Sequence, residues 1–198
     1  MFPLIIISGP AGVGKTTVAK ALLKIYPALR TSVTYTTRRP RQLSTEDKKM
    51  NYVSVEEFTR RRNADEFLEW AKVHGDFYGT HRQETEQLLG EGPVLFNIDV
   101  QGAEQLTSRY PDRCVTIFLI PESFEQMVEH IKNRGEMTQG DFKARLKSAE
   151  FELAKKDHFE HQVVNAEGKL SETIETIAKI IEPCLGNSHD IDKKTAVR

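Results

Sequence analysis

The sequence predicts an α/β protein with a three-layer core built on a mainly parallel sheet, a small inserted α+β lobe and a helical lid. Short apolar runs at 4–7, 93–99 and 115–120 each lead towards a helical pattern, as the buried strands of a parallel sheet do. Strand patterns on both sides of one short helix between residues 33 and 80 indicate the inserted lobe. A polar segment broken by glycines at 132–140 is typical of a hinged lid.

The composition fits one globular domain and excludes several kinds of partner. The chain has 198 residues, of which 38% are hydrophobic and 29% are charged, and its net charge is −1. Such a charge gives no overall field that would attract nucleic acid or an anionic membrane. The two cysteines, Cys114 and Cys184, predict neither a disulfide framework nor a zinc site. The apolar start is short and lacks a basic region, so we expect a core strand and a cytoplasmic protein.

The first strand leads directly into the strongest motif of the chain. Residues 9–16 match the pattern G-x-x-x-x-G-K-[ST] of a phosphate-binding loop, and a helical pattern follows until Pro27. The alternative, a glycine-rich turn without a ligand, does not explain the flanking strand and helix. Lys15 is expected to reach the β- and γ-phosphates of ATP and Thr16 to bind Mg²⁺. The predicted ATP-binding residues are Gly9, Pro10, Ala11, Gly12, Val13, Gly14, Lys15, Thr16 and Thr17.

The inserted lobe begins with an extended segment and a basic cluster. Residues 32–37 alternate, and three arginines follow within four residues, which is either an anion site or a solvated loop. A capping box at Ser54 and Glu57 predicts a helix to about Asn63. Two strands follow, at 67–71 and 77–80.

Another capping pattern, from Thr80 to Gln83, predicts the helix that returns the chain to the core.

The next strand ends at Asp99, where an acid helps to hold Mg²⁺ in phosphate-loop enzymes, although a turn aspartate is also possible there. After the third core strand, Ser123 and Gln126 predict a helix with Phe124, Val128 and Ile131 on its buried face.

The last third of the chain carries the lid and closes the core. Arg134 lies in the polar lid segment, and Arg145 lies on the helix expected at 141–156. A strand at 162–165 and a helix at 171–181 complete the fold. The boundaries expected for a single domain are core 1–32, 81–121 and 150–186, lobe 33–80, lid 122–149 and a mobile tail 187–198.

The order of these elements resembles the guanylate kinase family across about residues 3–182. The similar stretches, besides the phosphate loop, are 32–41, 51–54, 67–71, 78–80, 98–102 and 134–135. The resemblance implies a P-loop NTPase core, a lobe that binds the nucleoside monophosphate, and transfer of the γ-phosphoryl group of ATP to GMP or dGMP with Mg²⁺. It also implies small-molecule substrates, a monomer or homodimer, and no nucleic-acid or membrane partner.

The resemblance assigns the acceptor site. Arg38, Arg41 and Tyr78 are expected to hold the GMP phosphate, because paired guanidinium groups suit a dianion. Glu69 is expected to accept from the N1–H and amine of guanine, which adenine cannot satisfy. Thr34, Thr80 and Asn97 are expected to contact the base, and the lid residues Arg134 and Arg145 to neutralise charge on the transferring group.

Three positions depart from the family pattern. Met50 replaces a tyrosine that bonds the GMP phosphate, Asn97 replaces an aspartate, and His130 replaces a lid arginine. Met50 and Asn97 favour a first alternative, a related kinase acting on another phosphorylated small molecule. A non-catalytic binding module is opposed by the intact phosphate loop, and an ATPase or nucleotide switch leaves the lobe unexplained.

Overall fold

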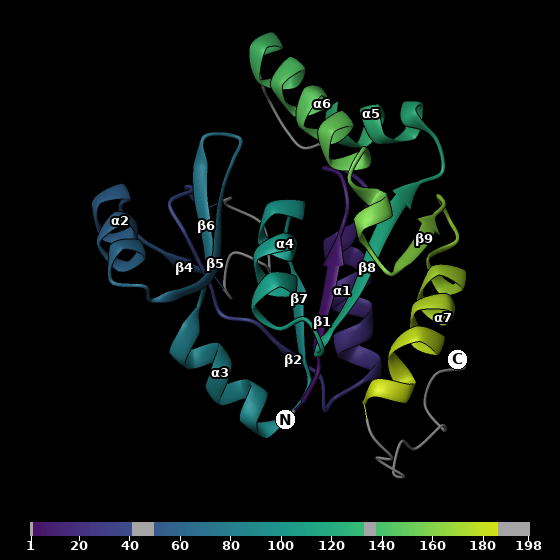
Figure 1. Ribbon diagram of the computed structural model, residues 1–198. Coiled ribbons are helices and arrows are strands. Elements are labelled where there is room, and N and C mark those ends of the chain that lie inside the picture. Colours follow the sequence, from purple (N-terminus) through teal and green to yellow (C-terminus); the bar gives the residue numbers. More distant parts are fainter. Residues whose placement is uncertain (1, 41–49, 133–137, 186–198) are drawn as a thin grey trace.

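The computed structural model describes residues 2–40, 50–132 and 138–185. In these residues the core is a five-stranded sheet of order β2-β7-β1-β8-β9, in which every pairing is parallel (Figure 1). Its strands are β1 (Leu4–Ser8), β2 (Arg30–Thr31), β7 (Val94–Asn97), β8 (Cys114–Pro121) and β9 (His161–Asn165). The expected mainly parallel sheet is confirmed, and the short edge strand β2 was not predicted.

Helices cover both faces of this sheet because the central strand is apolar on both sides. Ile5 and Ile7 pack against α1 (Lys15–Ile25) and α7 (Leu170–Ile181). Leu4 and Ile6 face the opposite way, towards α4 (Val100–Arg109) and Leu89 of α3 (Arg82–Glu91). Successive side chains of a strand point to opposite faces. An unbroken apolar run therefore gives a sheet that is covered by helices on both faces, which makes three layers.

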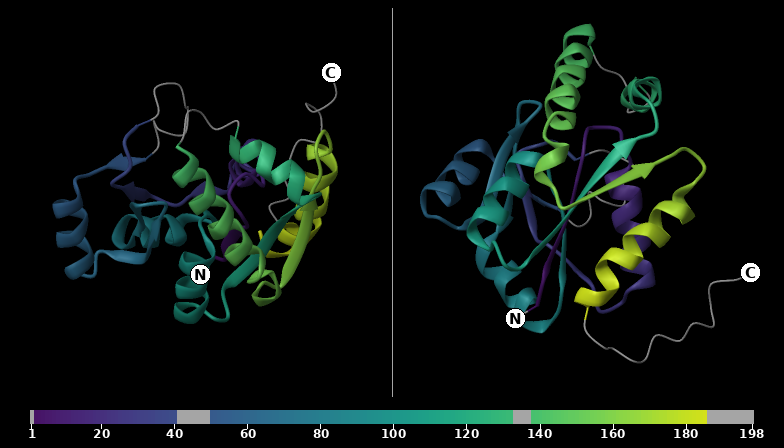
Figure 2. Two further views of the ribbon diagram at one scale, coloured as in Figure 1. Left: turned by 90° about the horizontal axis from the view of Figure 1, so that it is seen from above. Right: turned by 45° about the vertical axis from the view of Figure 1, so that its right-hand side comes forward.

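The lobe has its own four-stranded sheet, of order β4-β3-β6-β5, beside the core (Figure 2, left). Its elements are β3 (Thr34–Thr36), β4 (Asn51–Tyr52), α2 (Val55–Asn63), β5 (Phe67–Val73) and β6 (Asp76–His81). Phe58 of α2 stacks on Phe67 and Phe77, with ring centroids 4.6 and 5.3 Å away. These rings form the small core of the lobe.

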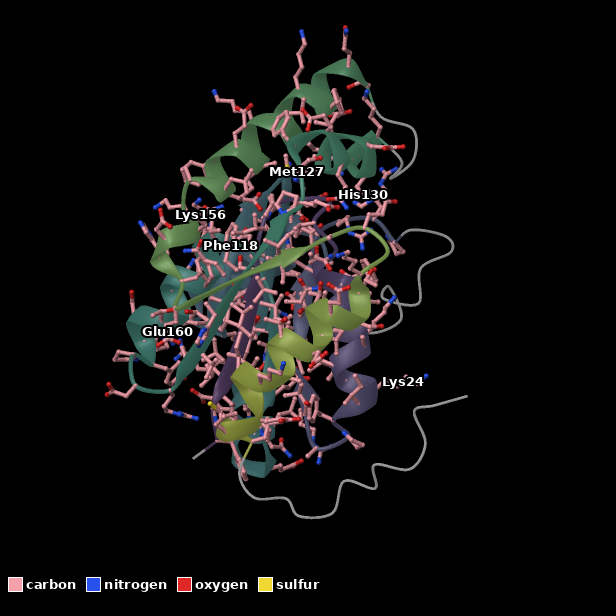
Figure 3. The ribbon with its side chains drawn as sticks, turned by 90° about the vertical axis from the view of Figure 1, so that its right-hand side faces the viewer. Lys24, Phe118, Met127, His130, Lys156 and Glu160 are labelled. Atoms are coloured by element: carbon pink, nitrogen blue, oxygen red, sulfur yellow. The ribbon has the colours of Figure 1, made fainter. Side chains whose placement is uncertain are left out.

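Two helices after β8 stand over the phosphate loop. They are α5 (Phe124–Lys132) and α6 (Gln139–Leu153), and short 3₁₀ turns follow later at Lys156–His158 and Glu182–Cys184. Met127, Ile131 and Ala149 form a buried cluster with Ala11 of the loop. Met127 and His130 lie between α6 and the sheet, whereas Lys24 lies at the far end of α1 (Figure 3).

Two local predictions are wrong. Helix α3 begins at Arg82, where the ring of His81 accepts from the backbone N–H of Glu84, and Thr80 is instead a buried residue of β6. On α5, Phe124 is 42% exposed, and Met127 is buried in its place. Ile131, the last residue of the predicted face, is buried as expected.

Candidate active site

A pocket lies where the phosphate loop, the end of β7, the lobe sheet and helix α6 meet. The predicted site residues that line it are Pro10, Ala11, Lys15, Thr16, Thr34, Arg38, Glu69, Tyr78, Asn97, Asp99 and Arg145. Thr80 lies behind Glu69, to which its hydroxyl donates, and Thr17 is exposed on α1. Arg41 and Arg134 lie outside the described residues. Segments far apart in the sequence therefore face one space.

The phosphate loop curls because three glycines adopt backbone angles that other residues rarely take. Gly9, Gly12 and Gly14 have φ values of 138°, 90° and 93°. A Cβ on Gly9 would also lie 2.5 Å from the carbonyl oxygen of Leu119. Helix α1 starts directly after Gly14 without a side-chain cap, which leaves its first N–H groups to an anion. The Lys15 ammonium donates to the carbonyls of Gly9 and Pro10 within the loop.

The end of β7 carries two polar residues on either side of Ile98. The amide nitrogen of Asn97 donates to the hydroxyl of Thr16 at 3.2 Å. Asp99 caps α4, since its Oδ1 accepts from the N–H of Gly102 at 2.8 Å. Its Oδ2 is buried and has no hydrogen-bond partner among the described residues. Burial raises the pKa of Asp99, and the Gly102 N–H and the charge of Lys15 oppose that rise.

Glu69 is a buried acid in the wall that the lobe contributes. Its side chain is 4% exposed, and its Oε1 accepts from the Thr80 hydroxyl at 2.5 Å. Its Oε2 lies against Gly102 of α4, where a Cβ would overlap it. Burial raises the pKa of Glu69 to about 7; the Thr80 hydroxyl lowers it and the negative charge of Asp99 raises it further.

This shift has a consequence for stability. An acid whose pKa is 4.5 in the unfolded chain and about 7 in the folded one keeps its proton longer when folded. The free energy of unfolding should therefore fall as the pH rises through that interval, by about 3 kcal/mol in total from this group. We expect Glu69→Gln to remove this pH-dependent component. In urea unfolding, the free energy of unfolding of the variant minus that of the wild type should therefore be more positive at pH 8 than at pH 4.5. An equal difference at both pH values would contradict a raised pKa.

The lobe also contributes a cation beside a thioether to the pocket. Arg38 donates to the carbonyl of Arg39 at 3.2 Å and approaches the sulfur of Met50 at 3.9 Å. Its guanidinium carbon also lies 6.0 Å from the centre of the Tyr52 ring. Tyr78 and Thr34 line the same space from β6 and β3. The arrangement suits an anion, and Met50 adds no donor to it.

The lid helices reach the loop and the pocket through side chains. The ring nitrogen Nδ1 of His130 lies 3.0 Å from the carbonyl oxygen of Gly12, so Nδ1 carries the proton in this contact. Arg145 and Glu152 of α6 line the pocket. Glu152 is buried and accepts from the Ser148 hydroxyl at 2.9 Å.

Sequence reasoning missed several residues that line the pocket. Glu152 looks like any charged residue of a long helix, and only its burial distinguishes it. His74 and Asp76 flank the turn between β5 and β6; the sequence predicted that turn but not that it faces the pocket. Ile98 is apolar and carried no signal of a ligand site.

The family model for guanylate kinase matches residues 2–184. The chain belongs to the guanylate kinase family. The guanylate kinase of Rhizobium johnstonii is 36% identical over 180 residues, covering 90% of this chain and 81% of that protein. The guanylate kinase of Geobacter sulfurreducens is 37% identical over 179 residues, covering 90% of this chain and 87% of that protein.

Solved structures agree with this family membership. The guanylate kinase of Anaplasma phagocytophilum is 30% identical, with a TM-score of 0.72 and coverage of 94% of this chain and 87% of that one. A gluconokinase from Sinorhizobium meliloti 1021 is 14% identical, with a TM-score of 0.52 and coverage of 93% and 95%, and it supports the phosphate-loop kinase fold alone. Within 2–40, 50–132 and 138–185, no helix of this guanylate kinase family member is long and apolar enough to cross a membrane.

Proposed function

We propose that this protein transfers the γ-phosphoryl group of ATP to GMP, and to dGMP, giving ADP and the nucleoside diphosphate. The observation that carries this proposal is the buried carboxyl of Glu69 in the pocket that also holds Lys15 and Thr16. A buried acceptor opposite a phosphate loop suits a base with two adjacent donors, N1–H and an amine, and guanine has this edge.

The ATP side of the proposal rests on the loop and on α1. The curled backbone of the phosphate loop and the uncapped start of α1 present N–H groups to phosphate oxygens. Lys15 now donates to carbonyls of its own loop. We propose that phosphate oxygens replace these carbonyls when ATP binds, which brings the ammonium to the β- and γ-phosphates.

The acceptor side rests on the lobe. We propose that Arg38, Tyr78 and Arg41 hold the phosphate of GMP and that Glu69, with Thr34 and Thr80, reads its base. The attacking oxygen of that phosphate is already anionic, so the reaction needs no general base. The chain's task is to hold acceptor and donor in line, with Arg145 and Arg134 bringing positive charge from the lid and closure excluding water.

Mg²⁺ fits this pocket as a partner of the nucleotide. The described residues contain no group of three or more His, Cys, Asp or Glu side chains that would bind a metal alone. The pocket does offer the Thr16 hydroxyl and the buried, unpartnered Oδ2 of Asp99. Mg²⁺ binds proteins in this way, through few side chains, water and substrate phosphates. When bound it neutralises charge on the phosphates, and we propose Thr16 and Asp99 as its protein contacts, partly through water.

The test of this function is an ADP-release assay with Mg·ATP and a panel of acceptors. The panel contains GMP, dGMP, AMP, CMP, UMP and a control without acceptor. Signal confined to GMP and dGMP is the expected result. A folded, ATP-binding protein that is silent with all acceptors would favour the alternative, a kinase for another phosphorylated molecule. Met50 supports that alternative, because it places a thioether, which cannot donate a hydrogen bond, beside Arg38.

Gly102→Ala provides a further prediction for the proposed base site. The added Cβ would overlap Oε2 of Glu69 and force that carboxyl to move. We expect the KM for GMP to rise by about tenfold, equivalent to about 1.4 kcal/mol of lost binding, with little change in ADP affinity. Gly90→Ala is the matched control, because a Cβ at that helical glycine meets nothing within 4 Å. Unchanged GMP kinetics in Gly102→Ala would mean that the position of Glu69 does not matter for the acceptor.

A further inference from the structure

The strand beside the phosphate loop ends in an amide that contacts the loop's hydroxyl. Asn97 is the last residue of β7 and pairs in register with Ile7 of β1. From there its Nδ2 reaches the Thr16 Oγ1 at 3.2 Å, and both side chains line the pocket. This contact joins the carboxyl end of β7, beside β1, to the first turn of α1.

Asp99, two residues further on, hydrogen-bonds with a different partner through one of its two oxygens. Its Oδ1 is engaged by the N–H of Gly102 at the start of α4, and its charge acts on Glu69. The side chain at the end of β7 that hydrogen-bonds with Thr16 is therefore the neutral one.

The amide can serve the Thr16 hydroxyl in two ways. In the contact described here the Asn97 nitrogen donates to the Thr16 oxygen, which occupies a lone pair that a cation would use. A hydroxyl that binds a cation through its oxygen gives its proton to another acceptor. An asparagine turned by 180° about its last bond presents Oδ1 for this proton, since its amide carries both donor and acceptor atoms.

We propose that Asn97 is a positioning residue for Thr16: it accepts the Thr16 hydroxyl proton when Mg²⁺ and nucleotide are bound, and it does so without adding negative charge. The inference rests on the proposed function. It implies that the cation is held mainly by the nucleotide phosphates, with less charge from the protein than an aspartate at residue 97 would give.

The experiment measures binding of Mn²⁺, used as a spectroscopic substitute for Mg²⁺, to the complex of the full chain with ADP by electron paramagnetic resonance. Asn97→Ala removes the acceptor and should weaken Mn²⁺ binding about fivefold, the size expected for one hydrogen bond. Asn97→Asp keeps an acceptor and adds a charge, so it should tighten Mn²⁺ binding about tenfold. Asn51→Asp adds the same charge on β4, outside the residues that line the pocket, and should leave Mn²⁺ binding unchanged.

A double-mutant cycle with Thr16→Val separates positioning from a general effect of charge. If Asn97 acts through the Thr16 hydroxyl, Asn97→Ala should have no further effect in the Thr16→Val background. Wild-type Mn²⁺ affinity in both Asn97 variants, or a full Asn97→Ala effect without the Thr16 hydroxyl, would overturn the inference. A shift confined to GMP affinity would overturn it too and return Asn97 to the acceptor site.

Failure of the proposed function gives a different result. It would appear in the wild type, as absence of ADP binding or of GMP-dependent ADP release. Normal wild-type behaviour in both assays leaves the proposed function standing, and the variants then test Asn97 alone.

Discussion

Lys15→Ala is expected to abolish measurable phosphoryl transfer to GMP while leaving the protein folded. The ammonium is the one described cation that emerges from the phosphate loop itself, and it already lies against the carbonyls that phosphate oxygens would replace. Loss of a charge that stabilises the transferring group costs a factor of about 10³ or more in rate. The assay is ADP release with saturating Mg·ATP and GMP.

The fold should survive this change because Lys15 lies at the edge of the pocket and not in the core. The two loop carbonyls it leaves can be hydrated from the pocket, so the midpoint of thermal unfolding should shift by only a few degrees. Lys24→Ala is the matched control, since Lys24 is an exposed lysine in the last turn of the same helix (Figure 3). A folded Lys15→Ala protein with near-wild-type turnover would refute the assignment of the loop to ATP.

The centre of the core sheet could be predicted from the sequence because its three middle strands, β7, β1 and β8, are largely buried on both faces. Mostly apolar runs mark β1, β7 and β8, whereas the edge strands β2 and β9 carry exposed residues and give a weaker signal. The start of α3 could not be predicted, because Thr80 and His81 can both cap a helix. The position of the cap depends on a residue distant in sequence. The Thr80 hydroxyl donates to Glu69 within the lobe, and the His81 ring caps α3 instead.

The sequence predicted which residues belong to the candidate site, but it did not predict the contacts between them. The loop motif predicted Lys15 and Thr16, and the resemblance to the guanylate kinase family implied Glu69; all three line one pocket. The contact of Asn97 with Thr16 depends on the register of β7 against β1 and on where the strand ends. Burial of Glu152 depends on how α6 packs over the loop, which the local sequence does not encode.

Glu69→Gln should reduce kcat/KM for GMP by about 10²- to 10³-fold while changing ADP affinity less than twofold. The Thr80 hydroxyl already donates to Oε1. In the variant the glutamine oxygen keeps this bond, so its NH₂ group takes the place of Oε2. Two hydrogens then face the donors of guanine in a buried site, where unpaired donors are costly.

A substrate that lacks the exocyclic amine makes the test of Glu69 sharper. Inosine monophosphate keeps N1–H but has no amine, so the wild type should prefer GMP to it strongly, and Glu69→Gln should narrow that preference. Glu175→Gln is the matched control, because it makes the same change on the exposed face of α7. If Glu69→Gln lowers ATP binding and GMP use equally, or keeps the wild-type preference for GMP, Glu69 supports the pocket without reading the base. The raised pKa adds an independent check, because a carboxylate that must accept from guanine should lose GMP affinity as the pH falls below about 7.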